Sequence, residues 1–167
     1  MQMEPWEIWV RSTALSHFVL AHELWVWPVL EMLHYLGLSM LFGTVGLFDL
    51  RVLGLLKRIP IGALHRLVPF GLAGYAVNLL TGLTFFSAHP DQYAYNSAFH
   101  WKLVFMSLAA INVLAFYTTA FKGLRQLPPQ ASAPPLARTL TAISLICWVG
   151  VLSCGRLLTF YRPPFFH

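Results

Sequence analysis

Four long apolar stretches divide this chain, and they constrain its fold more than any other feature of the sequence. About 20 consecutive apolar residues are needed to cross roughly 30 Å of hydrocarbon as a helix. Hydrophobic residues make up 57% of the chain and charged residues only 10%, against roughly 25% charged residues in soluble domains. The sequence therefore predicts one transmembrane domain over residues 1–167, with spans at about 26–50, 64–87, 98–121 and 137–160.

All four spans are predicted to be helices, because an open strand edge in lipid leaves backbone donors and acceptors unpaired. Continuous apolar runs also lack the alternation of residues that marks the strands of a membrane barrel. The connections between the spans are short, and short connections favour antiparallel neighbours. We therefore expect an all-α, up-and-down bundle of four transmembrane helices. Cys147 and Cys154 are too far apart along the last helix to bond to each other, and are predicted to be core residues.

Basic residues gather in the first and third connections, whereas the second connection has no Lys or Arg. These basic residues are Arg51, Lys57, Arg58, Arg66, Lys122, Arg125 and Arg138. The positive-inside rule predicts that they face the cytoplasm and that both termini of this multi-pass protein lie on the opposite, outer side of the membrane. This bias accounts for most of the net charge of +5, so no nucleic-acid partner is expected. Residues 4–22 are aromatic but too polar to span, and are predicted to form a helix in the outer interface of the lipid.

The histidines are concentrated on one predicted side of the membrane. Those on or near the outer face are His17, His22, His34, His89, His100 and His167, and only His65 is on the inner face. His34 precedes Arg51 by 17 residues, or about 25 Å along a helix, which places it inside the outer leaflet. His100 lies near the outer start of the third span. Ionisable side chains at membrane depth are costly and are candidate functional residues.

A haem b held between His34 and His100 is the first chemistry that fits this pattern. Neutral imidazoles on two facing helices can grip haem iron from both sides, and the first and third helices of such a bundle often lie diagonally across its core. Gly37 and Gly82 are predicted to leave room for the macrocycle. Close approach of the helices is the alternative role for these glycines.

Two basic side chains complete the predicted cofactor site. Lys102 lies four residues into the third span, and Arg156 lies near the outer end of the fourth. Arg156 is predicted either to bind a haem propionate or to form an ion pair with Glu31. Lys102 has Glu31 as an alternative partner.

Two other functions remain open. Glu31 and His34 form one Glu-x-x-His pair, which is half of a di-iron site. The sequence has no second such pair. A copper or zinc site that adds His22, His89 or Glu31 to the ligands is an alternative. The other possibility is an accessory or assembly subunit of a larger membrane complex without a cofactor. In that case the polar residues only pack the bundle.

The run WVWPVLEMLHYLGLSMLFGTVGLFDLRVLG, together with TGLTFF (residues 81–86) and NSAFHWKLVFM (residues 96–106), resembles an uncharacterised bacterial family of four-helix inner-membrane proteins. More distantly, the layout is similar to copper-resistance D-type membrane proteins and to four-helix b-type cytochromes. The resemblance implies the same four-helix fold, with histidines of the outer leaflet binding haem or copper. We expect an electron-transfer protein, rather than a stand-alone catalyst, that exchanges electrons with a quinone or a periplasmic redox protein.

Overall fold

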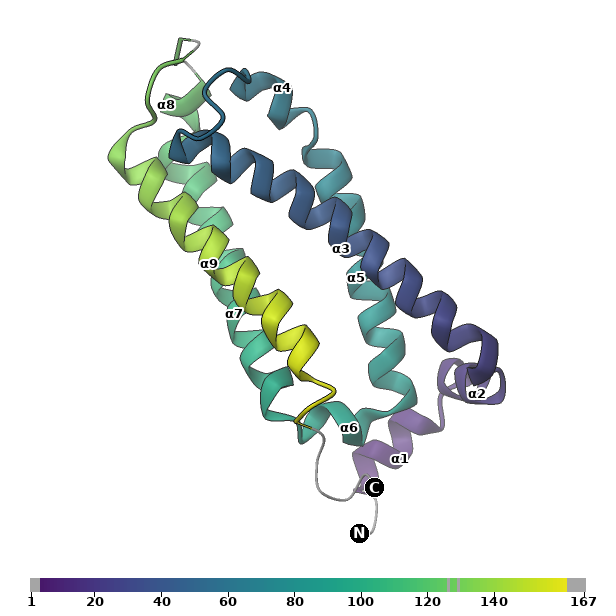
Figure 1. Cartoon of the computed structure of the whole chain (residues 1–167). Helices are drawn as coiled ribbons and strands as arrows, with labels where there is room; N and C mark the ends of the chain where they lie inside the picture. Colours follow the sequence, from purple (N-terminus) through teal and green to yellow (C-terminus); the bar gives the residue numbers. More distant parts are fainter. Residues whose placement is uncertain (1–3, 126, 129, 162–167) are drawn as a thin grey trace.

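The computed structural model describes residues 4–125, 127–128 and 130–161, and within these residues the chain is helical without any strand (Figure 1). In chain order the elements are α1 (Pro5–Arg11), α2 (Ala14–Ala21), α3 (Glu23–Leu53), α4 (Ile61–His65), α5 (Val68–Ala88), α6 (Pro90–Ala94), α7 (Ser97–Ala115), the π-helical turn η1 (Phe116–Ala120), α8 (Phe121–Arg125) and α9 (Pro135–Leu157).

The described residues contain four helical segments that are long and apolar enough to cross a membrane. They are Glu23–Leu53, Ile61–Ala88, Ser97–Leu124 and Pro135–Leu157. Consecutive long helices run antiparallel (Figure 1). The all-α fold class and the four apolar helices predicted from the sequence are confirmed, and their exposed apolar faces are compatible with contact with membrane lipid.

The N-terminal segment forms two short helices where one helix over residues 4–22 was predicted. The break lies at Ser12 and Thr13, whose hydroxyls donate to the carbonyls of Trp9 and Val10. Thr13 Oγ1 also accepts from the backbone N–H of Ser16 at 3.3 Å and so caps α2. Such local bonds offer the backbone an alternative to a continuous helix, and this explains the interruption.

Helices α3 and α5 form the first antiparallel pair, and two glycines allow their close approach. A methyl group added at Gly74 would stand 2.5 Å from the carbonyl oxygen of Gly37, and one added at Gly37 would stand 2.8 Å from the carbonyl oxygen of Gly74. Asn78 Nδ2 crosses the same contact and donates to the carbonyl oxygen of His34 at 3.2 Å. Small residues that bring backbones together are a common basis for helix packing in membranes.

Helices α7 and α9 form the second pair, and α3 joins the two pairs by packing against α9. Asn112 Nδ2 of α7 donates to the carbonyl oxygen of Leu140 on α9 at 3.0 Å. A buried cluster at the junction consists of Leu41, Ala109, Cys147, Trp148 and Val151. Cys147 and Cys154 are both free and buried, as predicted. The two pairs diverge towards the end of the bundle that carries α1, α2 and α6 (Figure 1).

The opposite end of the bundle is closed by α4, η1 and α8 (Figure 1). A second buried cluster lies there, formed by Val52, Phe116, Ala120, Leu124, Ala133 and Ala137. Arg51 is buried in the same region, and its Nε donates to the carbonyl oxygen of Ile59 at 2.6 Å. Gly54 ends α3 in the left-handed conformation, with φ of 100°, which a residue without a side chain adopts at little cost.

Candidate functional site

His34 lies on the face of α3 that packs against α5. Its Nδ1 is 2.7 Å from Thr81 Oγ1, and its ring meets that of Phe85 edge-on, with 5.6 Å between the ring centroids. The imidazole is partly buried. The ring, held by a hydrogen bond on one side and by an aromatic wall on the other, is therefore fixed in orientation within an apolar helix.

The contacts of Thr81 also set the tautomer of His34. The Thr81 hydroxyl lies 2.7 Å from the carbonyl oxygen of Val77 and 3.2 Å from that of Asn78, and neither carbonyl can donate a hydrogen. With the hydroxyl hydrogen directed to these carbonyls, Thr81 Oγ1 is left to accept from Nδ1–H of His34. We infer that Nε2 carries the free lone pair, which is the form of imidazole that binds a metal.

Residues of α5 and α7 act on His34, and a residue of α9 interacts in turn with Lys102 of α7. A methyl group added at Gly82 of α5 would stand 3.9 Å from Cε1 of His34, in ordinary van der Waals contact. Lys102 of α7 acts electrostatically on His34 and also interacts with Cys154 of α9. We call these five residues, His34, Thr81, Gly82, Lys102 and Cys154, the His34 cluster.

Gly37 allows close approach of two helices, which was the alternative to leaving room for a haem. The space that its missing side chain leaves is taken by Asn78 Nδ2, the carbonyl oxygen of Gly74 and Val77 Cγ1, all within 3.0 Å of an added methyl group. Gly37 therefore serves the contact between α3 and α5. Gly82 is the predicted glycine that borders the imidazole.

His100 and Arg156 make contacts with residues close to them in the sequence. His100 Nε2 lies 2.8 Å from the carbonyl oxygen of Ala94, and the side chain is exposed. The guanidinium carbon of Arg156 lies 5.7 Å from the ring centroid of Phe160. In the described part of the chain, no hydrogen bond or ring contact joins His34 to His100.

The three further candidate ligands are also separate from His34. Trp27 Nε1 donates to Glu31 Oε1 at 3.2 Å, and His22 Nδ1 lies 3.0 Å from the carbonyl oxygen of Phe18. His89 packs edge-on against Trp27, with 5.3 Å between the ring centroids. Among the described residues, no three His, Cys, Asp or Glu side chains form a group that could hold a metal ion. Metal ligation by several protein side chains therefore gains no support.

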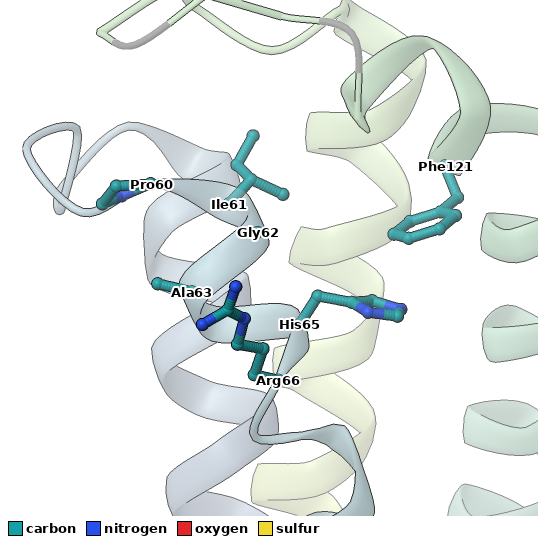
Figure 2. A pocket seen from close by; sticks show the side chains of 7 residues that line it. All are labelled: Pro60, Ile61, Gly62, Ala63, His65, Arg66 and Phe121. Carbon is teal, nitrogen blue, oxygen red and sulfur yellow. The ribbon is translucent and has the colours of Figure 1, made fainter.

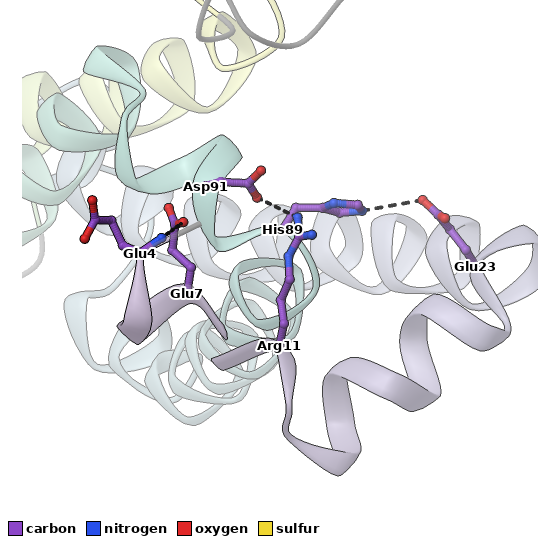
Figure 3. A network of polar contacts seen from close by, with 6 residues as sticks. All are labelled: Glu4, Glu7, Arg11, Glu23, His89 and Asp91. Carbon is purple, nitrogen blue, oxygen red and sulfur yellow. Dashed lines mark hydrogen bonds and ion pairs between the residues drawn. The ribbon is translucent and has the colours of Figure 1, made fainter. Parts of the chain in front are cut away.

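Polar contacts tie α1 to α6 and the start of α3 to the turn between α5 and α6 (Figure 3). Arg11 Nη2 lies 2.9 Å from Asp91 Oδ1, and His89 Nε2 lies 3.5 Å from Glu23 Oε1. Both pairs are partly exposed, and pairs of this kind contribute about 0–1 kcal/mol each. Their main effect is therefore to position α1 beside α6 and the start of α3 beside the turn between α5 and α6.

His65, the histidine predicted on the inner face, borders a pocket of about 640 Å³ at the other end of the molecule (Figure 2). Its ring stacks on Phe121, with 4.8 Å between the ring centroids, and Arg66 also lines the pocket. The residues that line the pocket come from α4 and its flanks and from Phe121 of α8, and α4 and α8 lie at the end of the bundle opposite α1, α2 and α6 (Figure 1). The pocket holds one histidine, so it is not a site for a haem with two histidine ligands.

Two residues that stand out in the structure, Thr81 and Asp49, were not predicted from the sequence. Thr81 orients His34, and the signal for it was its position one turn after Asn78 on the small-residue face of α5. Asp49 is buried in α3, although the sequence analysis gave it no role beyond its place in the run that carries the resemblance. An acid within an apolar run was the available signal.

Comparison of the chain with protein families, with curated proteins and with solved structures found no match. The resemblance to a bacterial four-helix family therefore stays a prediction from the sequence.

Proposed function

We propose that this chain is a b-type haem protein in which His34 is an axial ligand of the iron. The observation that carries the proposal is the 2.7 Å hydrogen bond between His34 Nδ1 and Thr81 Oγ1. This bond fixes the orientation of the imidazole on an apolar helix and leaves the lone pair of Nε2 available to the iron. Haem iron bound there would accept and release one electron at a time.

A haem would give the partly buried Lys102 a partner for its charge, whereas copper would not. Haem b carries two propionates, and a cation in the low dielectric of a membrane protein attracts them. The same ammonium group would repel a cuprous ion placed beside His34. Lys102 is therefore the residue that we assign to a propionate, whereas Arg156, over the ring of Phe160, is the weaker candidate for that role.

The sequence and the structure differ on the second axial ligand of the proposed haem. The sequence predicts His100, but His100 Nε2 contacts the carbonyl oxygen of Ala94 and the side chain is exposed. We propose that His34 is the single histidine ligand in the conformation described here. A haem with one histidine ligand has a high-spin spectrum, whereas two histidines give a low-spin spectrum.

The proposed setting is a bacterial inner membrane, with both termini periplasmic and α1 and α2 in the outer interface. The excess of Lys and Arg in the first and third connections supports this orientation. His34 then lies in the outer leaflet. A haem at this depth can exchange electrons with a quinone or a periplasmic redox protein, either alone or as a subunit of a larger complex.

An optical spectrum of the protein purified after expression with added haem precursor tests the proposal. We expect a Soret band and, after reduction, the bands of a ferrous b-type haem. A colourless preparation would contradict the haem proposal and leave the accessory subunit as the better account. Metal analysis of that preparation would then test the copper alternative.

His100→Ala tests the single-ligand assignment in the same preparation. The variant should keep both the haem and its spin state, because His100 is turned towards Ala94. A change from a low-spin to a high-spin spectrum would show instead that His100 leaves Ala94 and completes the site predicted from the sequence.

A further inference from the structure

Asp49 is a carboxylic acid buried between α3 and α9, apart from the His34 cluster. The residue is only 5% exposed, and its Oδ2 is fully buried without a hydrogen-bond partner among the described residues. The hydroxyl group of Ser144 on α9 lies beside the Asp49 carboxyl group. Buried polar atoms are nearly always paired, so the unpartnered oxygen calls for an explanation.

No described basic side chain forms an ion pair with this carboxyl group. Arg51, the nearest cation along α3, donates from Nε to the carbonyl oxygen of Ile59. His65 of α4 is stacked on Phe121. Cys147, one turn from Ser144 on α9, is a free thiol and carries no positive charge to offset a carboxylate.

Protonation explains the burial of the Asp49 carboxyl group better than a bound metal cation does. An isolated carboxylate is expensive to bury, and such a group must find a cation or take up a proton. A metal cation needs several oxygen ligands, whereas Asp49 belongs to no group of three His, Cys, Asp or Glu side chains among the described residues. A proton needs no such group of ligands, and it removes the negative charge that makes a buried, unpartnered oxygen so expensive.

We propose that Asp49 is a proton-binding site of the bundle, with a neutral carboxyl group that donates a hydrogen bond to Ser144 across the contact between α3 and α9. The site is independent of the proposed haem. Because the carboxyl group is almost fully buried, we expect its proton to exchange with water slowly, as α3 and α9 separate. Asp49 therefore links proton uptake and release to the packing of the two helix pairs.

Infrared spectroscopy of the full-length protein in lipid vesicles at neutral pH tests the proposal. The wild type should show the carbonyl band of a protonated carboxylic acid, and Asp49→Asn should lose it. The matched control is Glu31→Gln, which removes an exposed acid of the same helix and should leave the band unchanged. Absence of the band from the wild type, or its persistence in Asp49→Asn, would overturn the proposal.

Ser144→Ala provides a second test that keeps the acid in place. Loss of the acceptor should move the same band to higher frequency, because the carboxyl group loses its hydrogen bond. In deuterated buffer, the isotope shift of the wild-type band should develop more slowly than backbone exchange in the exposed connections. A band that is unmoved in Ser144→Ala would show that Asp49 does not donate to Ser144.

Discussion

Two side chains of α5 hold His34 from different sides. Asn78 Nδ2 donates to the backbone carbonyl of His34 at 3.2 Å, and Thr81 Oγ1 accepts from its ring at 2.7 Å. Residues that support a ligand in this way fix its orientation before any metal binds. The candidate site therefore consists of one histidine and the two side chains that hold it, rather than of a pair of histidines.

Thr81→Val should weaken haem binding about 10- to 100-fold, the usual cost of removing a supporting partner of a metal-bound histidine. Valine keeps the shape of threonine but cannot accept from Nδ1–H. Thr81→Ser, which keeps the hydroxyl, should restore most of the affinity. Haem titration of the apoprotein, followed at the Soret band, measures both variants. Equal losses in the two variants would show that Thr81 matters only for packing.

At the scale of the elements, the closest contact between α3 and α5 is made by Gly37 and Gly74. An added methyl group at Gly74 would stand 2.5 Å from the backbone of Gly37 and 2.9 Å from that of Leu41. Backbone atoms cannot move aside as a flexible side chain can. This contact also sets the height at which His34 faces Thr81, because Asn78 and Thr81 follow Gly74 on the same face of α5.

Gly74→Ala should therefore destabilise the bundle by about 1–3 kcal/mol, the usual cost of overpacking a close contact. Gly43→Ala is the matched control, since an added methyl group there meets no atom within 4 Å, and it should be neutral or slightly stabilising. Thermal unfolding in detergent compares the two variants. Equal melting temperatures would contradict the role given to the glycine contact.

At the scale of the whole molecule, the sequence predicts the architecture well because the length and continuity of the apolar runs determine it. The break between α1 and α2 was not predicted, since it depends on the local bonds of Ser12 and Thr13. Apolar and aromatic content, which guided the prediction of one helix, does not register such bonds.

For a similar reason, the sequence predicts only part of the candidate site. Counting residues along a helix gives the depth of His34 and His100 but not the direction in which each side chain points. That direction depends on which helices pair, and here α3 pairs with α5 and α7 with α9. His34 therefore meets Thr81, while His100, on the first turns of α7, turns to the carbonyl of Ala94.

The proposed orientation of the molecule predicts which residues an impermeant reagent can reach. His17→Cys, on the exposed face of α2, should react with a membrane-impermeant maleimide on intact spheroplasts. Arg58→Cys, in the exposed connection after α3, should react only after permeabilisation. The native cysteines are buried and provide a low background. The reverse pattern would show that both termini are cytoplasmic.

The most direct test of the central claim is the haem content of His34→Ala beside that of the wild type. Both proteins are purified after the same haem-supplemented expression, and His17→Ala serves as the control because its side chain is exposed and outside the cluster. We predict that the wild type and His17→Ala retain haem in equal amounts, and that His34→Ala loses it while remaining folded. Haem retained by folded His34→Ala with an unchanged spectrum would contradict the account.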